Sequence, residues 1–193
     1  MKGLLGGTFD PPHIGHLILA HEAASRFSLA EVLLVPSRLP PHKPAGSLSS
    51  FVHRLRMTEL AASTSPVLRA ADLEPAGAPS WTADLLERLK ASGEDICFIM
   101  GMDSLLELPA WKDPRRILGS ATVVAGTRPG FDPSAVPADL LDRVRIFAIP
   151  DVRISSTELR RRFALGLPTR YLVTEAVRDY VEGNGLYAGT EGD

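Results

Sequence analysis

Two histidines lie three residues apart in a glycine-rich segment near the start of the sequence, Gly6-Gly7-Thr8-Phe9-Asp10-Pro11-Pro12-His13-Ile14-Gly15-His16. A short apolar run precedes this segment and a stretch with helical period follows it, which predicts a strand, a turn and a helix. Side chains three positions apart share one face of a helix, so His13 and His16 would point together. The free N–H groups of a helix start, with two imidazoles beside them, favour binding of phosphate oxygens.

Plainer interpretations of this segment stay open. It could be a glycine-rich surface turn that carries two solvated histidines, or one half of a metal site. A metal site would need two further ligands, and no Cys or His pair supplies them at a suitable spacing. Gly6 and Gly7 lack a Cβ, which would let the backbone approach a ligand closely.

A second segment could also hold phosphate, Ile154-Ser155-Ser156-Thr157-Glu158-Leu159-Arg160. Its hydroxyls would lie at a helix start, and Arg160 adds a permanently charged bidentate donor one turn later. Ser155 and Glu158 also have the spacing of a capping box, and residues 160–162 could be a solvated helix face. On its own, this segment therefore fits a structural role as well as a functional one.

The composition describes an ordinary globular protein. Of 193 residues, 45% are hydrophobic and 23% are charged, and 21 basic against 23 acidic side chains give a net charge of -2. This balance does not indicate a nucleic-acid or membrane partner. A single cysteine, Cys97, excludes an intrachain disulfide. The apolar runs are far shorter than the ~20 residues that span a bilayer, and the first run is too short for a secretory signal. We expect a cytoplasmic location.

Short apolar runs without alternation predict strands that are buried on both faces of a parallel sheet: 2–6, 32–35, 96–100, 122–125 and 145–149. Apolar residues at helical spacing predict helices between them, beginning with Leu17, Ala20, Ala24 and Phe27. Two more follow at 55–61 and 85–89, and Ser80 could cap the latter. The alternation favours an open, Rossmann-like α/β parallel sheet flanked by helices.

After residue 150 the pattern becomes helical, over 155–165 and 174–182. We therefore expect one domain, 1–193, with a sheet core over 1–150 and a small helical C-terminal part over 151–187. Segments 36–50 and 128–137 are rich in prolines and read as loops, and 188–193 reads as a frayed end. Loops as long as 36–50 are often functional in compact domains.

The two phosphate-type segments together resemble the two signatures of the nucleotidyltransferase superfamily with the HxGH motif. Other segments resemble bacterial nicotinate-nucleotide adenylyltransferases: Pro40-Pro41-His42-Lys43, Ser80-Trp81-Thr82, Ile99 to Leu105, Trp111, and Asn184-Gly185-Leu186-Tyr187. The resemblance runs from Gly6 to Tyr187. It implies adenylyl transfer from ATP to nicotinate mononucleotide, giving deamido-NAD and pyrophosphate in NAD biosynthesis, with Mg²⁺ as the cofactor that accompanies ATP.

The resemblance also implies a role for each matching residue. The residues that would bind ATP are Gly6, Gly7, Thr8, Phe9, His13, His16, Ser156, Thr157 and Arg160. The residues that would bind nicotinate mononucleotide are Lys43, Thr82, Asp103 and Trp111. His13, His16, Lys43 and Arg160 would stabilise charge during catalysis. No side chain is expected to be dedicated to a metal.

Some of these residues have structural alternatives. Trp111 could be a core aromatic, Lys43 a solvated charge, and Asp103 the cap of a helix that begins at Ser104. Cys97 lies in a predicted buried strand and is a poor nucleophile candidate.

Departures from the family pattern affect three positions. Met102 stands where a smaller or polar residue is usual, and Thr174 and Ala176 stand where prolines are common. Met102 leaves open the shape of the pocket floor, and Thr174 and Ala176 leave open the rigidity of the last helix.

Two rival functions remain. Another enzyme of the superfamily, such as a phosphopantetheine adenylyltransferase or a cytidylyltransferase, should lack Ser80-Trp81-Thr82 and Trp111. A non-catalytic nucleotide-binding regulator would not require His13, His16 and Arg160 together. The preference for nicotinate over nicotinamide mononucleotide, the oligomeric state and closure of loop 36–50 on substrate stay open.

Overall fold

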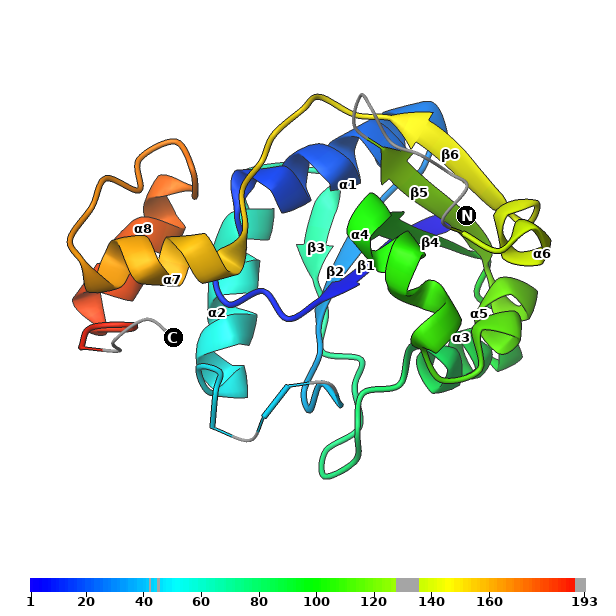
Figure 1. Cartoon of the computed structure of the whole chain (residues 1–193), viewed down its shortest axis with the longest axis horizontal. Coiled ribbons are helices and arrows are strands. Elements are labelled where there is room, and N and C mark those ends of the chain that lie inside the picture. The colour runs from blue at the N-terminus through cyan, green and yellow to red at the C-terminus, as the bar shows by residue number, and fades with distance from the viewer. Residues whose placement is uncertain (42, 45, 128–135, 190–193) are drawn as a thin grey trace.

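The computed structural model describes residues 1–41, 43–44, 46–127 and 136–189. In this part of the chain, parallel strands form one sheet in the order β3-β2-β1-β4-β5-β6 (Figure 1). Their bounds are β1 (Lys2–Gly7), β2 (Val32–Pro36), β3 (Leu68–Ala70), β4 (Ile96–Gly101), β5 (Thr122–Thr127) and β6 (Val144–Ala148). The predicted open α/β parallel sheet is confirmed.

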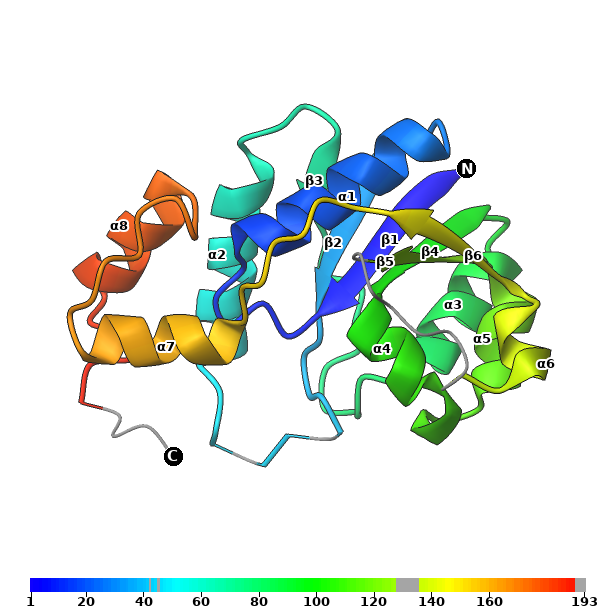
Figure 2. The ribbon, with the colours of Figure 1, turned by 45° about the horizontal axis from the view of Figure 1, so that its top comes forward.

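Helices flank this sheet and follow the strands in the expected alternation. They are α1 (Ile14–Arg26), α2 (Phe51–Ala62), α3 (Thr82–Ala91), α4 (Met102–Glu107), the 3₁₀ helix η1 (Leu108–Ala110), α5 (Pro114–Ser120), α6 (Ala138–Leu141), α7 (Ser156–Ala164) and α8 (Glu175–Gly183). Figure 2 shows α1 crossing one face of the sheet, with α3, α5 and α6 at the other side.

Successive strand residues pack into two different hydrophobic clusters. Leu5 and Ile99 face the cluster formed with α1 and α2, whereas Leu4 and Phe98 face the cluster formed with α3, α4 and α5. Both faces of the sheet are therefore buried, which is why these strands read as continuous apolar runs.

The structure adds four short elements that the sequence patterns did not predict. β3 and η1 have three residues each, α5 has seven and α6 has four. Each is too short to show a full period of hydrophobic residues, so packing against longer neighbours defines it. The last strand begins and ends one residue earlier than predicted.

The C-terminal helices lie beside α2 at one end of the molecule (Figure 1). Leu159, Val177 and Tyr187 belong to the same hydrophobic cluster as Leu5 and Met57. One continuous core thus joins the helical part to the sheet.

The three unusual positions are accommodated without a break in these elements. The Thr174 hydroxyl accepts a hydrogen bond from the N–H of Val177 at 3.3 Å and caps α8, while Ala176 is exposed in the first turn of that helix. Met102 opens α4 and packs half-buried against the second cluster. The predicted loop 128–137 and end 188–193 lie largely outside the described residues.

Among the described residues, no helix combines the length and the apolar character required to traverse a lipid bilayer.

Candidate active site

The site forms where the strand order reverses. β1 lies between β2 and β4, so the chain leaves the carboxyl ends of β1 and β4 in opposite directions and a crevice opens between them. Two clefts occupy this crevice. We call them the tryptophan cleft, about 240 Å³, and the histidine cleft, about 390 Å³. Thr8 and Lys43 line both, so the clefts meet at these residues.

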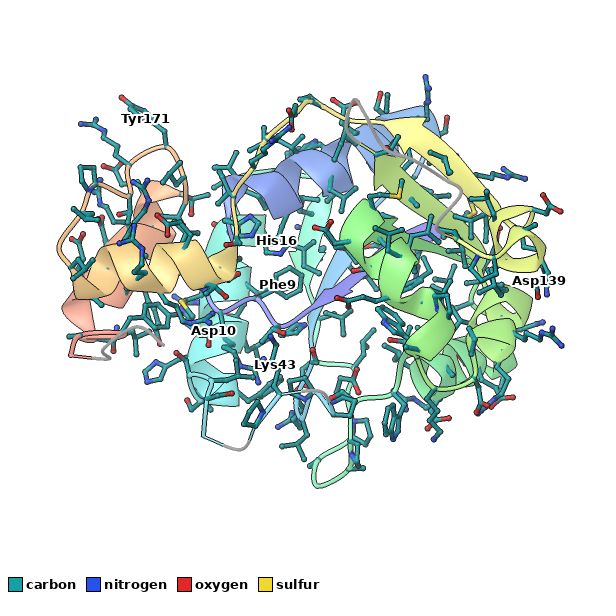
Figure 3. All side chains as sticks on the ribbon, viewed as in Figure 1. Phe9, Asp10, His16, Lys43, Asp139 and Tyr171 are labelled. Atoms are coloured by element: carbon teal, nitrogen blue, oxygen red, sulfur yellow. The ribbon has the colours of Figure 1, made fainter. Side chains whose placement is uncertain are left out.

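Each cleft contains part of the predicted site. Gly6 and Gly7, which were predicted to bind ATP, line the tryptophan cleft, and His13 and Asp103 line neither cleft. The tryptophan cleft includes Gly6, Gly7, Thr8, Lys43, Trp81, Thr82 and Trp111. The histidine cleft includes Thr8, Phe9, Asp10, His16, Lys43, Ser156, Thr157 and Arg160. Figure 3 shows Phe9, Asp10 and His16 gathered beside the end of β1, with Lys43 on the loop below them.

The two motif histidines are held together at the start of α1. His13 is the N-cap residue, and its backbone N–H donates to Nδ1 of His16 at 3.2 Å. Their rings stack with centroids 3.7 Å apart. Since Nδ1 of His16 accepts this bond, the neutral ring carries its proton on Nε2. His16 therefore offers an N–H donor to the histidine cleft.

Burial lowers the pKa of His16 well below its usual value of 6.5, and the neighbouring His13 lowers it further. The imidazole is consequently neutral at pH 7. A neutral donor suits a phosphate site because it needs no proton from the solvent before it binds an oxygen.

Glycines in this turn make room for aromatic rings. A Cβ added to Gly15 would lie 3.1 Å from Nδ1 of His13, and one added to Gly7 would lie 3.2 Å from the ring of Phe9. Phe9 itself adopts a left-handed backbone with φ of 51° and is 1% exposed. Its ring meets His16 edge-on, with centroids 4.9 Å apart. Phe9 thus lines the histidine cleft and packs against His16.

The second signature, at the start of α7, forms one wall of the histidine cleft. Ser155 caps this helix by accepting from the N–H of Glu158 at 3.2 Å, as its capping spacing predicted. Ser156 donates to the carbonyl of Pro11 at 2.9 Å. Arg160 donates to the carbonyl of Asp10 at 3.0 Å and to Oγ1 of Thr157 at 3.2 Å. The capping role and the cleft-lining role therefore coexist in one segment.

The neighbouring arginines have a different role. Arg161 and Arg162 both donate to the Glu158 carboxylate at 2.9 Å and form ion pairs on the outer side of α7. The solvated-face interpretation holds for these two residues, whereas Arg160 faces the cleft.

The tryptophan cleft brings together residues from α3 and the segment after η1. Thr82 is the first residue of α3, and Trp111 follows η1 directly. Trp111 is half-buried and packs edge-on against Phe98 with centroids 6.5 Å apart. It is therefore a partly packed aromatic that also presents a surface to the cleft.

Ser80 does not cap α3, contrary to the prediction. The N-cap position is Trp81, and the Ser80 hydroxyl instead accepts from the N–H of Leu39 at 3.0 Å. The Ser80 N–H also donates to the carbonyl of Leu39 at 2.9 Å. Ser80 therefore ties loop 36–50 to the start of α3.

Asp103 lies exposed in the first turn of α4, outside the set of described residues that line the two clefts. The helix begins at Met102 with Gly101 as its N-cap residue, so the alternative role of Asp103 as the cap is wrong. Ser104 and Glu107 of the same helix line the tryptophan cleft instead. Lys43 is exposed at the junction, and its neighbour His42 lies outside the described residues.

Three buried polar residues at the site were given no role from the sequence, although Asp10 and Tyr187 lie within segments that carry the family resemblance. Asp10 is fully buried, and its carboxylate accepts from the Tyr187 hydroxyl at 2.7 Å and from the N–H of Ser49 at 3.1 Å. Arg54 of α2 is 2% exposed, and within the described part of the chain it donates to backbone carbonyls. Asp10 stands inside the first signature, which is a signal that could have identified it. Arg54 and Tyr187 join it only through long-range contacts.

Neither metal ligation nor thiol chemistry has support in the described residues. They contain no group of three or more His, Cys, Asp or Glu side chains that could hold a metal ion. The carboxylate of Asp10 already accepts two hydrogen bonds. Burial raises the pKa of the Cys97 thiol to about 11, so Cys97 is protonated at pH 7.

The fold and the two facing phosphate-type segments define a nucleotidyltransferase. In agreement, residues 4–162 match the cytidylyltransferase-like family. Among curated proteins, the chain is 42% identical over 195 residues to a probable nicotinate-nucleotide adenylyltransferase of Roseiflexus castenholzii, with 96% of each chain covered. It is 41% identical over 206 residues to the corresponding protein of Aeromonas hydrophila, again with 96% of each chain covered. The chain thus belongs, within the cytidylyltransferase-like family, to the nicotinate-nucleotide adenylyltransferases.

A solved structure shares the fold. The nicotinic acid mononucleotide adenylyltransferase of Plasmodium falciparum, complexed with NaAD, superposes with a TM-score of 0.78 at 21% identity, covering 97% of this chain and 98% of that one.

Proposed function

We propose that this chain transfers the adenylyl group of ATP to nicotinate mononucleotide, producing deamido-NAD and pyrophosphate. The observation that carries the proposal is the meeting of the two clefts at Thr8 and Lys43. One cleft presents His16 and Arg160, which suit a triphosphate, and the other presents Trp111 and Thr82, which suit a pyridine nucleotide. Two substrates bound in adjoining clefts would have their phosphates at the junction.

ATP would bind in the histidine cleft. The Nε2–H of His16 and the guanidinium of Arg160 would donate to phosphate oxygens from opposite walls, with the hydroxyls of Ser156 and Thr157 at the start of α7. His13 would act beside His16, because its stacked ring and its N–H fix the orientation of the second imidazole. Gly6 and Gly7 line the adjoining tryptophan cleft, so they would border the ATP only where the two clefts meet at the end of β1.

Nicotinate mononucleotide would bind in the tryptophan cleft. The Trp111 ring would stack on the pyridine ring, and backbone amides at Thr82, where α3 starts, would meet the carboxylate. Lys43 would approach the acceptor phosphate from the loop. A contact of Asp103 with the ribose or the nicotinate side is also proposed, and it requires the exposed Asp103 side chain to turn toward the cleft.

The reaction requires no covalent enzyme intermediate. An oxygen of the acceptor phosphate attacks the α-phosphorus of ATP, the bond from that phosphorus to the bridging oxygen breaks, and pyrophosphate leaves with the electron pair. Positioning of the two phosphates can contribute roughly 7–11 kcal/mol, and the donors around them stabilise the developing charge. Magnesium would enter as part of the MgATP substrate, bound to triphosphate oxygens.

We further propose that residues 1–193 act as one domain, with the sheet core over 1–150 and the helical part over 151–187. The support is the shared cluster that joins Leu159 and Val177 to Leu5. A cytoplasmic location remains the prediction from the sequence.

The experiment is a pyrophosphate-release assay with MgATP and one acceptor at a time: nicotinate mononucleotide, nicotinamide mononucleotide or phosphopantetheine. Fast release with the nicotinate acceptor alone is the expected result. Release with phosphopantetheine alone would assign the chain to the rival enzyme class. Tight ATP binding without release for any acceptor would favour the regulator.

A further inference from the structure

Arg54 is a buried cation whose hydrogen-bond acceptors, within the described part of the chain, are backbone carbonyls. The side chain is 2% exposed and rises from α2 toward the end of β1. Its Nη1 donates to the carbonyl of Thr8 at 2.9 Å and to that of Ser37 at 2.7 Å. Its Nη2 donates to the carbonyl of Arg38 at 3.2 Å, and its Nε to that of Ser49 at 3.1 Å.

These carbonyls belong to the three segments that build the junction of the two clefts. Thr8 follows β1 and lines both clefts, and Ser37 follows β2 and lines the tryptophan cleft. Arg38 and Ser49 stand near the two ends of loop 36–50. One guanidinium therefore hydrogen-bonds to the segment after β1, to the segment after β2 and to the last part of loop 36–50.

A second buried group completes this arrangement from the other side. The carboxylate of Asp10 accepts from the N–H of Ser49 at 3.1 Å, while Arg54 donates to the Ser49 carbonyl. Both backbone polar groups of Ser49 are thus held by buried charges of opposite sign. The Arg38 guanidinium lies 3.9 Å from the centroid of the Phe51 ring, which anchors the first part of the loop beside α2.

Only an arginine can make this set of contacts. A guanidinium has five donors in a rigid plane, whereas a lysine ammonium has three donors around one atom. Burial lowers the pKa of Arg54, but the nearby carboxylate of Asp10 acts in the opposite direction. The side chain remains charged at pH 7, because the pKa of an arginine lies far above neutral pH.

We propose that Arg54 is a positioning residue for adenylyl transfer. It sets the relative placement of Thr8, Ser37 and Ser49, and through them the alignment of the acceptor phosphate with the α-phosphorus. This inference rests on the proposed function, since it assumes that the two substrates meet at the junction. An error of about 1 Å in such an alignment can cost ~100-fold in rate without loss of either binding site.

The test compares Arg54→Lys with Ala61→Gly at 10 °C. Ala61 is a buried residue of the same helix that stands about two turns away, so its glycine variant destabilises α2 without touching the junction. Circular dichroism and thermal unfolding establish the folded fraction of each variant. Calorimetry then gives the Kd for ATP, and steady-state assays give kcat and the KM for nicotinate mononucleotide.

For Arg54→Lys we expect kcat to fall by about 10- to 100-fold while the Kd for ATP stays within about threefold of wild type. Ala61→Gly should keep the wild-type kcat per folded molecule. In a Lys43→Ala background, the Arg54→Lys change should cost less than it does alone, because Lys43 belongs to the loop that Arg54 fixes.

Several results would overturn the proposal. One is a kcat for Arg54→Lys within about twofold of wild type; another is an equal loss in Ala61→Gly. Failure of both Arg54→Lys and Arg54→Gln to fold would make Arg54 a folding residue and would also reject it. A wild-type protein that is inactive with nicotinate mononucleotide would instead reject the proposed function.

Discussion

The backbone N–H of His13 donates a hydrogen bond to Nδ1 of His16 at 3.2 Å, and the two imidazole rings stack 3.7 Å apart. This relationship explains the spacing of the motif. The first histidine ends the turn and orients the second, which lines the histidine cleft. A Cβ on Gly15, between them, would lie 3.1 Å from Nδ1 of His13, so this position leaves little room for a side chain.

Replacing His16 should remove a donor that acts on the transition state. We expect His16→Ala to reduce kcat by at least ~100-fold with little change in the thermal midpoint. His21→Ala is the matched control, because His21 is exposed on the same helix. Near-normal turnover of His16→Ala in the pyrophosphate-release assay would remove His16 from the mechanism.

The lowered pKa of His16 predicts a pH-dependent stability. Below about pH 6.5 the unfolded histidine binds a proton that the folded one does not, so stability falls as the pH decreases from 6.5 toward the folded-state pKa. Above pH 6.5 this contribution is constant. Urea unfolding at pH 7.5 and 5.5 should therefore show a larger loss for wild type than for His16→Gln. Equal losses would mean that His16 titrates normally in the folded state.

Gly15→Ala should separate helix stability from activity. Alanine is the better helix former by about 1 kcal/mol, but its Cβ would lie 3.1 Å from Nδ1 of His13. We expect turnover to drop because the stacked pair is displaced. Gly119→Ala in α5 is the control, since a Cβ there meets nothing within 4 Å. Full activity of Gly15→Ala would show that the His13 ring can move without consequence.

Trp111→Ala should mainly raise the KM for nicotinate mononucleotide, because the ring would stack on the pyridine. Trp111→Phe should recover most of this loss, since a smaller aromatic keeps a stacking face. Kinetics at saturating ATP distinguish these effects. An unchanged KM in the alanine variant would mean that Trp111 only packs against Phe98 and does not bind the substrate.

Arg160→Ala should weaken the binding of ATP more than that of the acceptor. Arg161→Ala provides the comparison, because Arg161 pairs with Glu158 on the outer side of the same helix. Calorimetric titration with each substrate gives the two affinities. Equal losses for ATP and nicotinate mononucleotide would indicate that Arg160 has a structural role through the Asp10 carbonyl.

The strands and helices could be predicted where one segment is long enough to show a complete apolar run or a full helical period of hydrophobic residues. The buried strands β1, β2, β4 and β5 and the striped helix α1 were recognisable for this reason. β3, α5 and α6 were not, because three to seven residues hold too little periodicity and their form depends on neighbouring elements.

The residues of the candidate site differ in the same way: those within a local motif could be predicted, and those joined by long-range contacts could not. Local motifs drew attention to His16 and Arg160, which line the histidine cleft, and to His13, which stacks on His16. Arg54 was not recognised, and Tyr187 was noted only as part of the segment 184–187. Their contacts with Thr8 and Asp10 join residues that are 46 and 177 positions apart in the sequence. A buried arginine in an amphipathic helix has no distinctive spacing, so only the folded chain reveals what it holds.

The most direct test of the account follows the adenylyl group itself. ATP labelled with ³²P at the α-phosphorus would be incubated with the wild-type protein, Mg²⁺ and nicotinate mononucleotide, and the products separated by chromatography. We expect the label to appear in deamido-NAD, one equivalent for each pyrophosphate released, with none on the protein. Label retained on the protein, or released only as AMP, would contradict direct transfer between two substrates that meet at the junction of the clefts.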